Sequence, residues 1–150
     1  MISQTAEYAL RAITHMALNP NKAQTSHDIA HATLVPPPYL SKVLQLLGRS
    51  GLIMAQRGLH GGFTLLKSPR DISVFEVIQA VDPLQRITTC PLGIKSHGAN
   101  LCPLHKRLDN AMEVLERSFR ETTIAEILSE PTNSHPLCPL PPPKAGASVK

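Results

Sequence analysis

The sequence predicts a mainly α-helical fold with a small β-wing, that is, a winged helix-turn-helix domain followed by a long amphipathic helix. Three observations predict it. An apolar pattern with the period of a helix opens on the prolines of residues 36–38 and closes at Gly51. Two short strand-like runs then flank a glycine-rich turn. Finally, an apolar stripe with helical spacing runs from Pro103 to Phe119.

Three helices are expected ahead of the wing. The first covers residues 3–18, where Ser3 is a suitable N-cap and an Asn-Pro pair ends the helix. Thr25 and Asp28 have the spacing of a capping box and open a second, short helix. The third helix follows the prolines and carries its apolar residues on one face: Leu40, Val43, Leu44 and Leu47. Two short helices around a tight turn, the second with a polar outer face, form a helix-turn-helix.

The wing is expected over residues 52–66. Its strands are predicted at 52–56 and 63–66, and three glycines between them supply the turn. Ser73 and Glu76 repeat the capping-box spacing ahead of a fourth helix. Residues 82–100 lack any periodicity and are predicted to form a loop.

The last helices and the tail complete the domain organisation. The long helix begins at Pro103, and Thr123 and Glu126 open a final short helix. The proline-rich end of the chain cannot form a core. We therefore divide the chain into a winged helix-turn-helix domain (1–82), a cysteine-bearing sensor loop (83–102), the long helix with the short helix (103–130) and a disordered tail (131–150).

The charge of the chain is concentrated on one segment. The formal net charge is +4 and the sequence pI is about 9.2. Residues 29–70 contain no Asp or Glu, whereas five residues there are basic: Lys42, Arg49, Arg57, Lys67 and Arg70. A surface of this kind suits a polyanion such as double-stranded DNA.

Composition argues against several classes of protein. No run of eighteen apolar residues exists, so no membrane partner or membrane span is expected. The N-terminus lacks the features of a signal peptide, and three cysteines do not suit a secreted disulfide framework, so we expect a cytoplasmic protein. The sequence has no nucleophile elbow, phosphate loop or plausible carboxylate pair, and we do not expect an enzyme.

Candidate DNA contacts lie on the third helix and at the wing tip. A recognition helix presents its N-terminal residues to base edges in the major groove, while flanking groups hold phosphates. Ser41 or Gln45 is suited to read a base edge, and Lys42 to bind a base or a phosphate. The full candidate set is Pro38, Tyr39, Ser41, Lys42, Gln45, Arg49, Arg57 and His60. The alternative is a winged helix that uses this basic face on an acidic protein partner.

A second group of candidates surrounds the loop. Cys90 and Cys102 bracket it, His97 lies within it, and His105 follows Cys102 by three residues. If Cys102 starts the long helix, His105 falls one turn later on the same face. Thiolates and an imidazole suit zinc or an iron–sulfur cluster. Neither cysteine belongs to a C-x2-C pair, however, so unliganded thiols in a flexible loop are the alternative to a metal site.

Several segments resemble a known family. EYALRAITHMAL, PPPYLSKVLQLLGRSGLI, RGLHGGFTL, SVFEVIQAVD and TTIAEIL, in this order and with the cysteine-bearing loop before the last of them, resemble the Rrf2 family of bacterial regulators, which includes IscR and NsrR. The resemblance covers about residues 1–130. It implies a homodimer in which the long helix is the dimerisation helix. It also implies operator binding by the third helix and the wing, usually to repress transcription.

The resemblance also implies a sensor. In many members the loop holds a 2Fe-2S or 4Fe-4S cluster that senses iron–sulfur status, nitric oxide or redox state. Cys90 matches the first cluster cysteine, Cys102 the last, His105 the histidine ligand of IscR-like members, and Glu7 an acid that some relatives supply from the other subunit. The middle cysteine is missing, because the loop offers a serine and a histidine instead. Other relatives carry no cluster and act through a protein partner or thiol oxidation. Both kinds of regulator remain open at this point.

Overall fold

The computed structural model describes residues 2–97 and 100–131. The predicted disordered tail therefore lies outside the described residues, apart from residue 131. The elements are α1 (Gln4–Ala17), α2 (Ser26–Thr33), α3 (Pro37–Arg49), β1 (Ile53–Gln56), β2 (Gly62–Leu65), α4 (Val74–Val81), α5 (Pro103–Glu121) and α6 (Ile124–Ser129), with 3-10 turns at Pro69–Asp71 and Lys95–His97. This mostly helical fold with one antiparallel strand pair confirms the predicted fold class.

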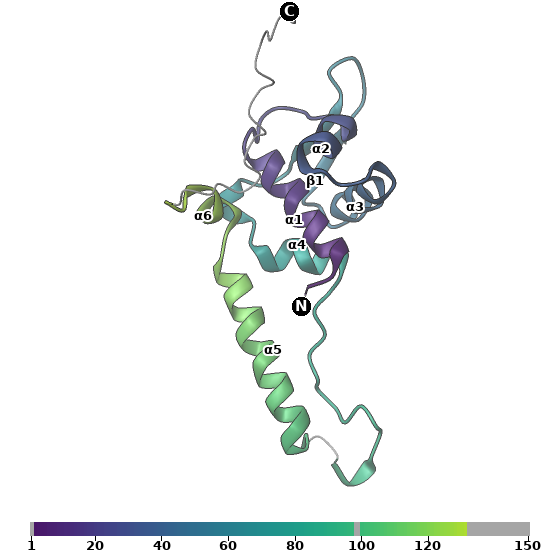
Figure 1. Cartoon of the computed structure of the whole chain (residues 1–150), viewed down its shortest axis with the longest axis vertical. Helices are drawn as coiled ribbons and strands as arrows, with labels where there is room; N and C mark the ends of the chain where they lie inside the picture. Colours follow the sequence, from purple (N-terminus) through teal and green to yellow (C-terminus); the bar gives the residue numbers. More distant parts are fainter. Residues whose placement is uncertain (1, 98–99, 132–150) are drawn as a thin grey trace, which may run out of the picture.

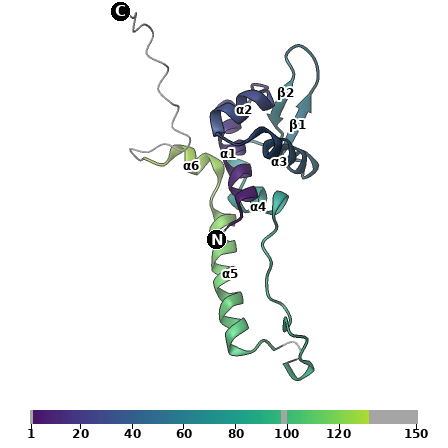
Figure 2. The same ribbon diagram turned by 45° about the vertical axis from the view of Figure 1, so that its right-hand side comes forward.

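The chain forms a helical head and a long arm (Figures 1 and 2). Helices α1 to α4 and the β-hairpin make up the head. Helix α5 extends away from it, and the segment that follows α4 runs along α5 to its far end. The base of the arm is held against α4, where the Arg120 guanidinium lies 3.5 Å from the centre of the Phe75 ring.

The core of the head is formed by the apolar faces of its helices. Ile13 of α1, Ile29 of α2 and Val77 of α4 are fully buried there. The four apolar residues predicted to face inward on α3 are all buried, which confirms that prediction: Leu40, Val43, Leu44 and Leu47. Helix α6 also packs here, because Ile124 belongs to the same buried cluster and its amide donates to the Ile72 carbonyl at 2.9 Å.

The caps predicted from the sequence are present at the helix N-termini. Ser3 accepts a bond from the Ala6 amide, and complete capping boxes open α4 and α6. The Thr25–Asp28 pair forms only half of a box. Thr25 accepts from the Asp28 amide, but the Asp28 carboxylate accepts from the Thr25 hydroxyl at 2.7 Å. Aspartate is one methylene shorter than glutamate, which explains why it does not reach back to the N-cap amide.

The wing is held to the head at its root. β1 pairs with β2 so that Gln56 lies opposite Gly62, and each strand begins or ends one residue away from the predicted bounds. Leu52 lies outside β1 because its amide donates to the Leu47 carbonyl at the end of α3. A further rung joins the wing to the loop before α2: Phe63 and Gln24 exchange both backbone bonds, at 2.8 and 3.0 Å.

Candidate nucleic-acid interface and cysteine loop

The eight predicted DNA contacts all lie on exposed surface of α3 and the wing. The polar face of α3 is exposed because its opposite face is committed to the core. The start of α3 is held against α1 by the edge-to-face contact of Tyr39 with Tyr8, whose ring centroids are 6.1 Å apart. Arg11 extends this contact, since it lies over the Tyr8 ring and donates to the Thr33 carbonyl at the end of α2.

A groove of about 340 Å³ separates α3 from the wing sheet. Ser41 and Gln45 line its α3 side, Ala55 and Phe63 its sheet side. The Ser41 hydroxyl donates to the Pro37 carbonyl at 3.1 Å, so it is left as an acceptor for an outside group. Ser26 of α2 also lines the groove, and no sequence signal singles it out.

Part of the positive charge of residues 29–70 is compensated by an acidic side chain. Lys67 forms an ion pair with Glu76 at 2.8 Å, so its charge is compensated. Partial burial acts to raise the pKa of Glu76, but hydrogen bonds from Lys67 and Ser73 lower it overall. Among the described residues, Lys42, Arg49 and Arg57 make no ion pair. Arg70, in the 3-10 turn that follows the wing, makes no ion pair among the described residues either, so the uncompensated charge lies on α3, the wing and that turn.

The predicted metal ligands are not brought together in one chain. Cys102 is the N-cap of α5 and its Sγ lies 3.3 Å from Nδ1 of His105, as the i, i+3 spacing predicts. Cys90 is a half-buried free thiol. Glu7 is occupied by Arg11, which it pairs with at 2.7 Å on the same face of α1. Across residues 2–97 and 100–131, no three His, Cys, Asp or Glu side chains form a group able to hold a metal ion.

An ion-pair cluster that sequence reasoning missed fixes the base of the loop to α5. Arg86 binds Asp109 in a bidentate pair, with bonds of 2.7 and 2.8 Å, and the Ile87 amide donates to the same carboxylate at 2.9 Å. Glu113 and Glu116 also face Arg86. The hydrogen bond to Arg86 lowers the pKa of Asp109, and the same bond raises the pKa of Arg86. The sequence signal that could have indicated this cluster is the row of acids at positions 109, 113 and 116.

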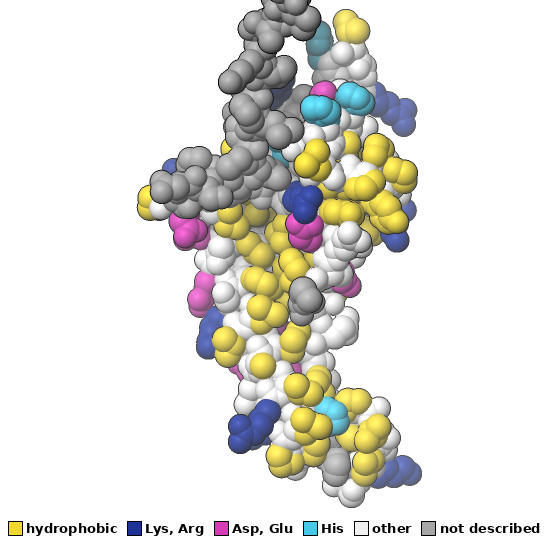
Figure 3. All heavy atoms as spheres, in the orientation of Figure 1, with side chains coloured by type: hydrophobic (Ala, Val, Ile, Leu, Met, Phe, Trp, Pro, Cys, Tyr) yellow, Lys and Arg dark blue, Asp and Glu magenta, His cyan; other side chains and the backbone are white. Residues whose placement is uncertain are grey.

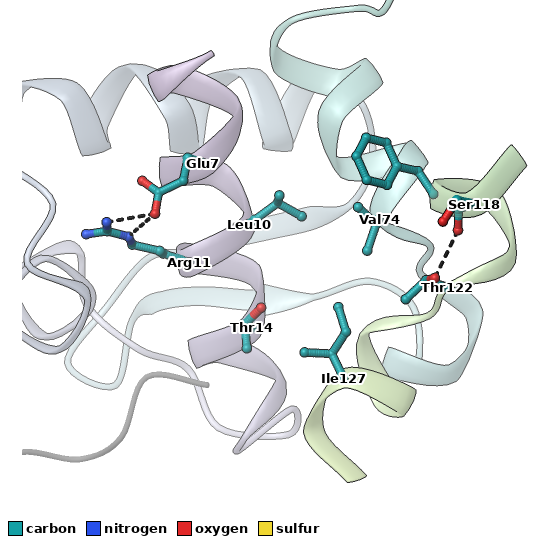
Figure 4. Close-up of a pocket in the computed structure, with 9 residues that line it drawn as sticks. Glu7, Leu10, Arg11, Thr14, Val74, Ser118, Thr122 and Ile127 are labelled. Atoms are coloured by element: carbon teal, nitrogen blue, oxygen red, sulfur yellow. Dashed lines mark hydrogen bonds and ion pairs between the residues drawn. The ribbon is translucent and has the colours of Figure 1, made fainter. Parts of the chain in front are cut away.

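The arm presents an apolar surface. None of the residues of α5 is buried, and hydrophobic side chains form a band along the arm (Figure 3). At the base of the arm the band reaches a pocket of about 570 Å³ between α1, α4, the end of α5 and α6 (Figure 4). Leu10, Val74 and Ile127 supply its apolar wall, and the Glu7–Arg11 pair lies at one side.

Comparison with known proteins decides the family. A family model named Rrf2, described as an iron-dependent transcriptional regulator, matches residues 2–130. The chain belongs to the Rrf2 family. It is similar to the HTH-type transcriptional regulator NsrR of Geobacillus kaustophilus, with 29% identity over 135 residues, which cover 86% of this chain and 90% of the relative.

Solved structures share the fold of this Rrf2 family member. IscR of T. potens aligns with a TM-score of 0.70 and 22% identity, over 85% of each chain. CymR, the global cysteine regulator of B. subtilis, aligns with a TM-score of 0.70 and 19% identity, over 85% of this chain and 95% of CymR. Family membership makes the chain a DNA-binding transcription regulator and not an enzyme. No helix within the described residues is long and apolar enough to cross a membrane.

The family raises the question of whether these residues fit an iron–sulfur cluster. A cluster of this kind takes four protein ligands, usually thiolates. Among the described residues of one chain, only Cys102 and His105 come together, while Cys90 stands apart and Glu7 is neutralised by Arg11. The described donors of a single chain therefore do not fit the group.

Proposed function

We propose that the protein is a homodimeric repressor that places α3 in the major groove of its operator and the wing in the neighbouring minor groove. The observation that carries this proposal is the charge of the exposed surface. Lys42, Arg49 and Arg57 project from α3 and the wing without acidic partners among the described residues, and residues 29–70 contain no acid. Phosphate contacts supply most of the affinity in such complexes, and base contacts supply specificity.

The exposed side chains of α3 divide between these two roles. Gln45 lines the groove beside Ser41 and is suited to a bidentate contact with adenine, whereas Ser41 is limited to accepting a bond. Lys42 lies beside them. Arg49 lies in the last turn of α3, where the phosphates that flank the DNA major groove would be within its reach. Tyr39 and Pro38 open the helix, and the contact of Tyr39 with Tyr8 fixes its entry angle.

The apolar arm supports the dimer. Leu104 and Leu108 of α5 are 62% and 48% exposed, which is unusual for the apolar face of a helix. A two-fold symmetric dimer buries the same patch on both copies. The arm of one copy can therefore cover the arm of the other copy and the pocket at the base of that arm. A dimer of this kind reads two half-sites, spaced by about one helical turn or a multiple of it. Occupying an operator in this way would obstruct transcription.

Control without a cluster fits the described residues better than control by a cluster. The ligand set is incomplete in one chain, and the loop is already fixed to α5 by Arg86 and Asp109. Of the alternatives that the sequence leaves open, we therefore favour a cluster-free regulator that responds through a protein partner or its thiols.

The salt dependence of DNA binding tests the proposal. The affinity for duplex DNA should fall steeply with salt, and Lys42→Ala or Arg57→Ala should each reduce the slope by about one unit. Lys106→Ala on the arm is the matched control, since it removes one exposed cation outside the interface. The absence of any salt-dependent complex would favour the protein-interaction alternative. An equal effect of Lys106→Ala would show that the DNA binds elsewhere.

A further inference from the structure

Leu59 at the tip of the wing is a large apolar side chain with no cover. It is 96% exposed in the described structure, and it lies between Arg57 and His60, which are exposed as well. The sequence predicts DNA contacts for these two neighbours but gives Leu59 no role. A single exposed leucine is ordinary on a helix surface, but its position at the end of a projecting hairpin is not.

The geometry of the turn holds Leu59 away from the head. The Gly61 amide donates to the Gly58 carbonyl at 3.0 Å and closes the turn that carries it. A Cβ at Gly61 would stand 2.5 Å from the Gln56 carbonyl oxygen, so the turn is tightly closed. The root of the hairpin is fixed by the Gln24–Phe63 rung. Figure 2 shows the hairpin loop extending beyond the helices.

The charge of the wing, and the fact that it belongs to one acid-free segment with α3, indicate what kind of surface covers Leu59. The wing belongs to the same acid-free segment as α3, and Arg57 lies two residues before the leucine. Arginine side chains are drawn to a narrow minor groove by its negative potential. Architectural proteins insert apolar side chains, leucine among them, between base steps from the minor groove. A rigid tip that combines an arginine with a projecting leucine has both features.

We propose that Leu59 is a wedge that enters the minor groove of the operator and partly unstacks one base step, while Arg57 holds the adjacent backbone. This inference rests on the proposed contact of the wing with the operator, and it adds how the wing tip binds there. Pyrimidine–purine steps unstack most easily, so the wedge selects a TA or CA step without any hydrogen bond to a base. Leu59 is then a specificity-determining residue, and its contribution is independent of salt because it carries no charge.

The test compares Leu59→Ala with Arg57→Ala on a set of operator duplexes. Each duplex carries 2-aminopurine at a different base step of the region that the wing covers. The wild type should brighten the probe at one step, because unstacking relieves its quenching. Leu59→Ala should abolish that signal and weaken binding about tenfold with an unchanged salt slope, since the loss is of buried apolar area. Arg57→Ala should reduce the slope instead. Leu59→Met should retain the signal, because methionine is also a wedge.

Two controls distinguish the wedge from a general loss of exposed apolar surface and from an unfolded wing. Leu92→Ala removes an exposed leucine from the cysteine loop and should change neither the signal nor the affinity. Slow exchange of the Phe63 amide in each variant verifies that the wing still folds. Full affinity of Leu59→Ala, or a wild type that brightens no probe, overturns the wedge while the regulator still binds DNA. A wild type that binds no duplex refutes the proposed function and the wedge together.

Discussion

Replacing Gly62 by alanine should show how strongly the wing depends on its root. Gly62 has a φ of +146°, and a Cβ there would stand 2.5 Å from the Gln24 carbonyl oxygen and 2.7 Å from its carbon. Both are backbone atoms, so the clash cannot be relieved by a side-chain rotation. The substitution must therefore separate the wing from the loop before α2. The two backbone bonds between Gln24 and Phe63 would be lost with it.

The magnitude follows from these two contributions. A non-glycine residue held at such a φ costs about 1 to 3 kcal/mol. Each lost backbone bond adds about 1 kcal/mol. Gly62→Ala should thus lower the free energy of unfolding by about 3 to 5 kcal/mol, a large part of the stability of a domain of this size.

Gly58→Ala is the matched control for this prediction. Gly58 also has a positive φ, +114°, but a Cβ there meets nothing within 4 Å. Its alanine variant should lose only the strain, about 1 to 3 kcal/mol. Urea unfolding followed by circular dichroism measures both variants, at one fixed protein concentration because formation of the proposed dimer would add to stability. Equal losses in the two variants would refute the reasoning, because the close approach to Gln24 would then contribute nothing.

Three further predictions concern the arm and the loop. Leu108→Glu should convert the proposed dimer to a monomer in sedimentation equilibrium, whereas Arg117→Glu, on the opposite face of the same helix, should not. A dimer in both variants would contradict the proposed interface. The pKa of Asp109 is lowered by its pairing with Arg86, so this pairing stabilises the fold above the usual carboxylate pKa near 4, and the stabilisation is lost as the pH falls through the lower pKa of the folded state. The difference in the free energy of unfolding between wild type and Arg86→Met should therefore be present at about pH 7 and vanish in acid. A difference that does not depend on pH would argue against the pair. Protein purified without oxygen should show no visible iron–sulfur absorption. Absorption with bound iron would show that donors beyond the described residues of one chain complete the ligand set.

Local signals made most of the fold predictable from sequence. The prolines before α3, the serine and threonine N-caps and the one-sided apolar pattern of α3 act within a few residues of one another. Each of these features occurs in the structure where it was expected. The Cys102–His105 contact belongs to the same class, because an i, i+3 spacing on a helix fixes proximity.

Contacts between distant segments could not be predicted in this way. The Gln24–Phe63 rung joins residues 39 positions apart, and neither residue type indicates the pairing. Arg86 and Asp109 are charged residues whose pairing depends on how the loop runs along α5. The position of Cys90 relative to Cys102 has the same dependence, and spacing alone could not decide whether the ligands meet.

Amide hydrogen exchange with and without operator DNA tests the central claim most directly. A duplex selected from random sequences by the protein itself serves as the operator. Binding should slow exchange in α3, residues 37–49, and in the wing, residues 53–65, and should leave the far end of the arm and the cysteine loop unchanged. Protection confined to the arm or the loop, with α3 and the wing unaffected, would contradict the claim that this surface reads DNA.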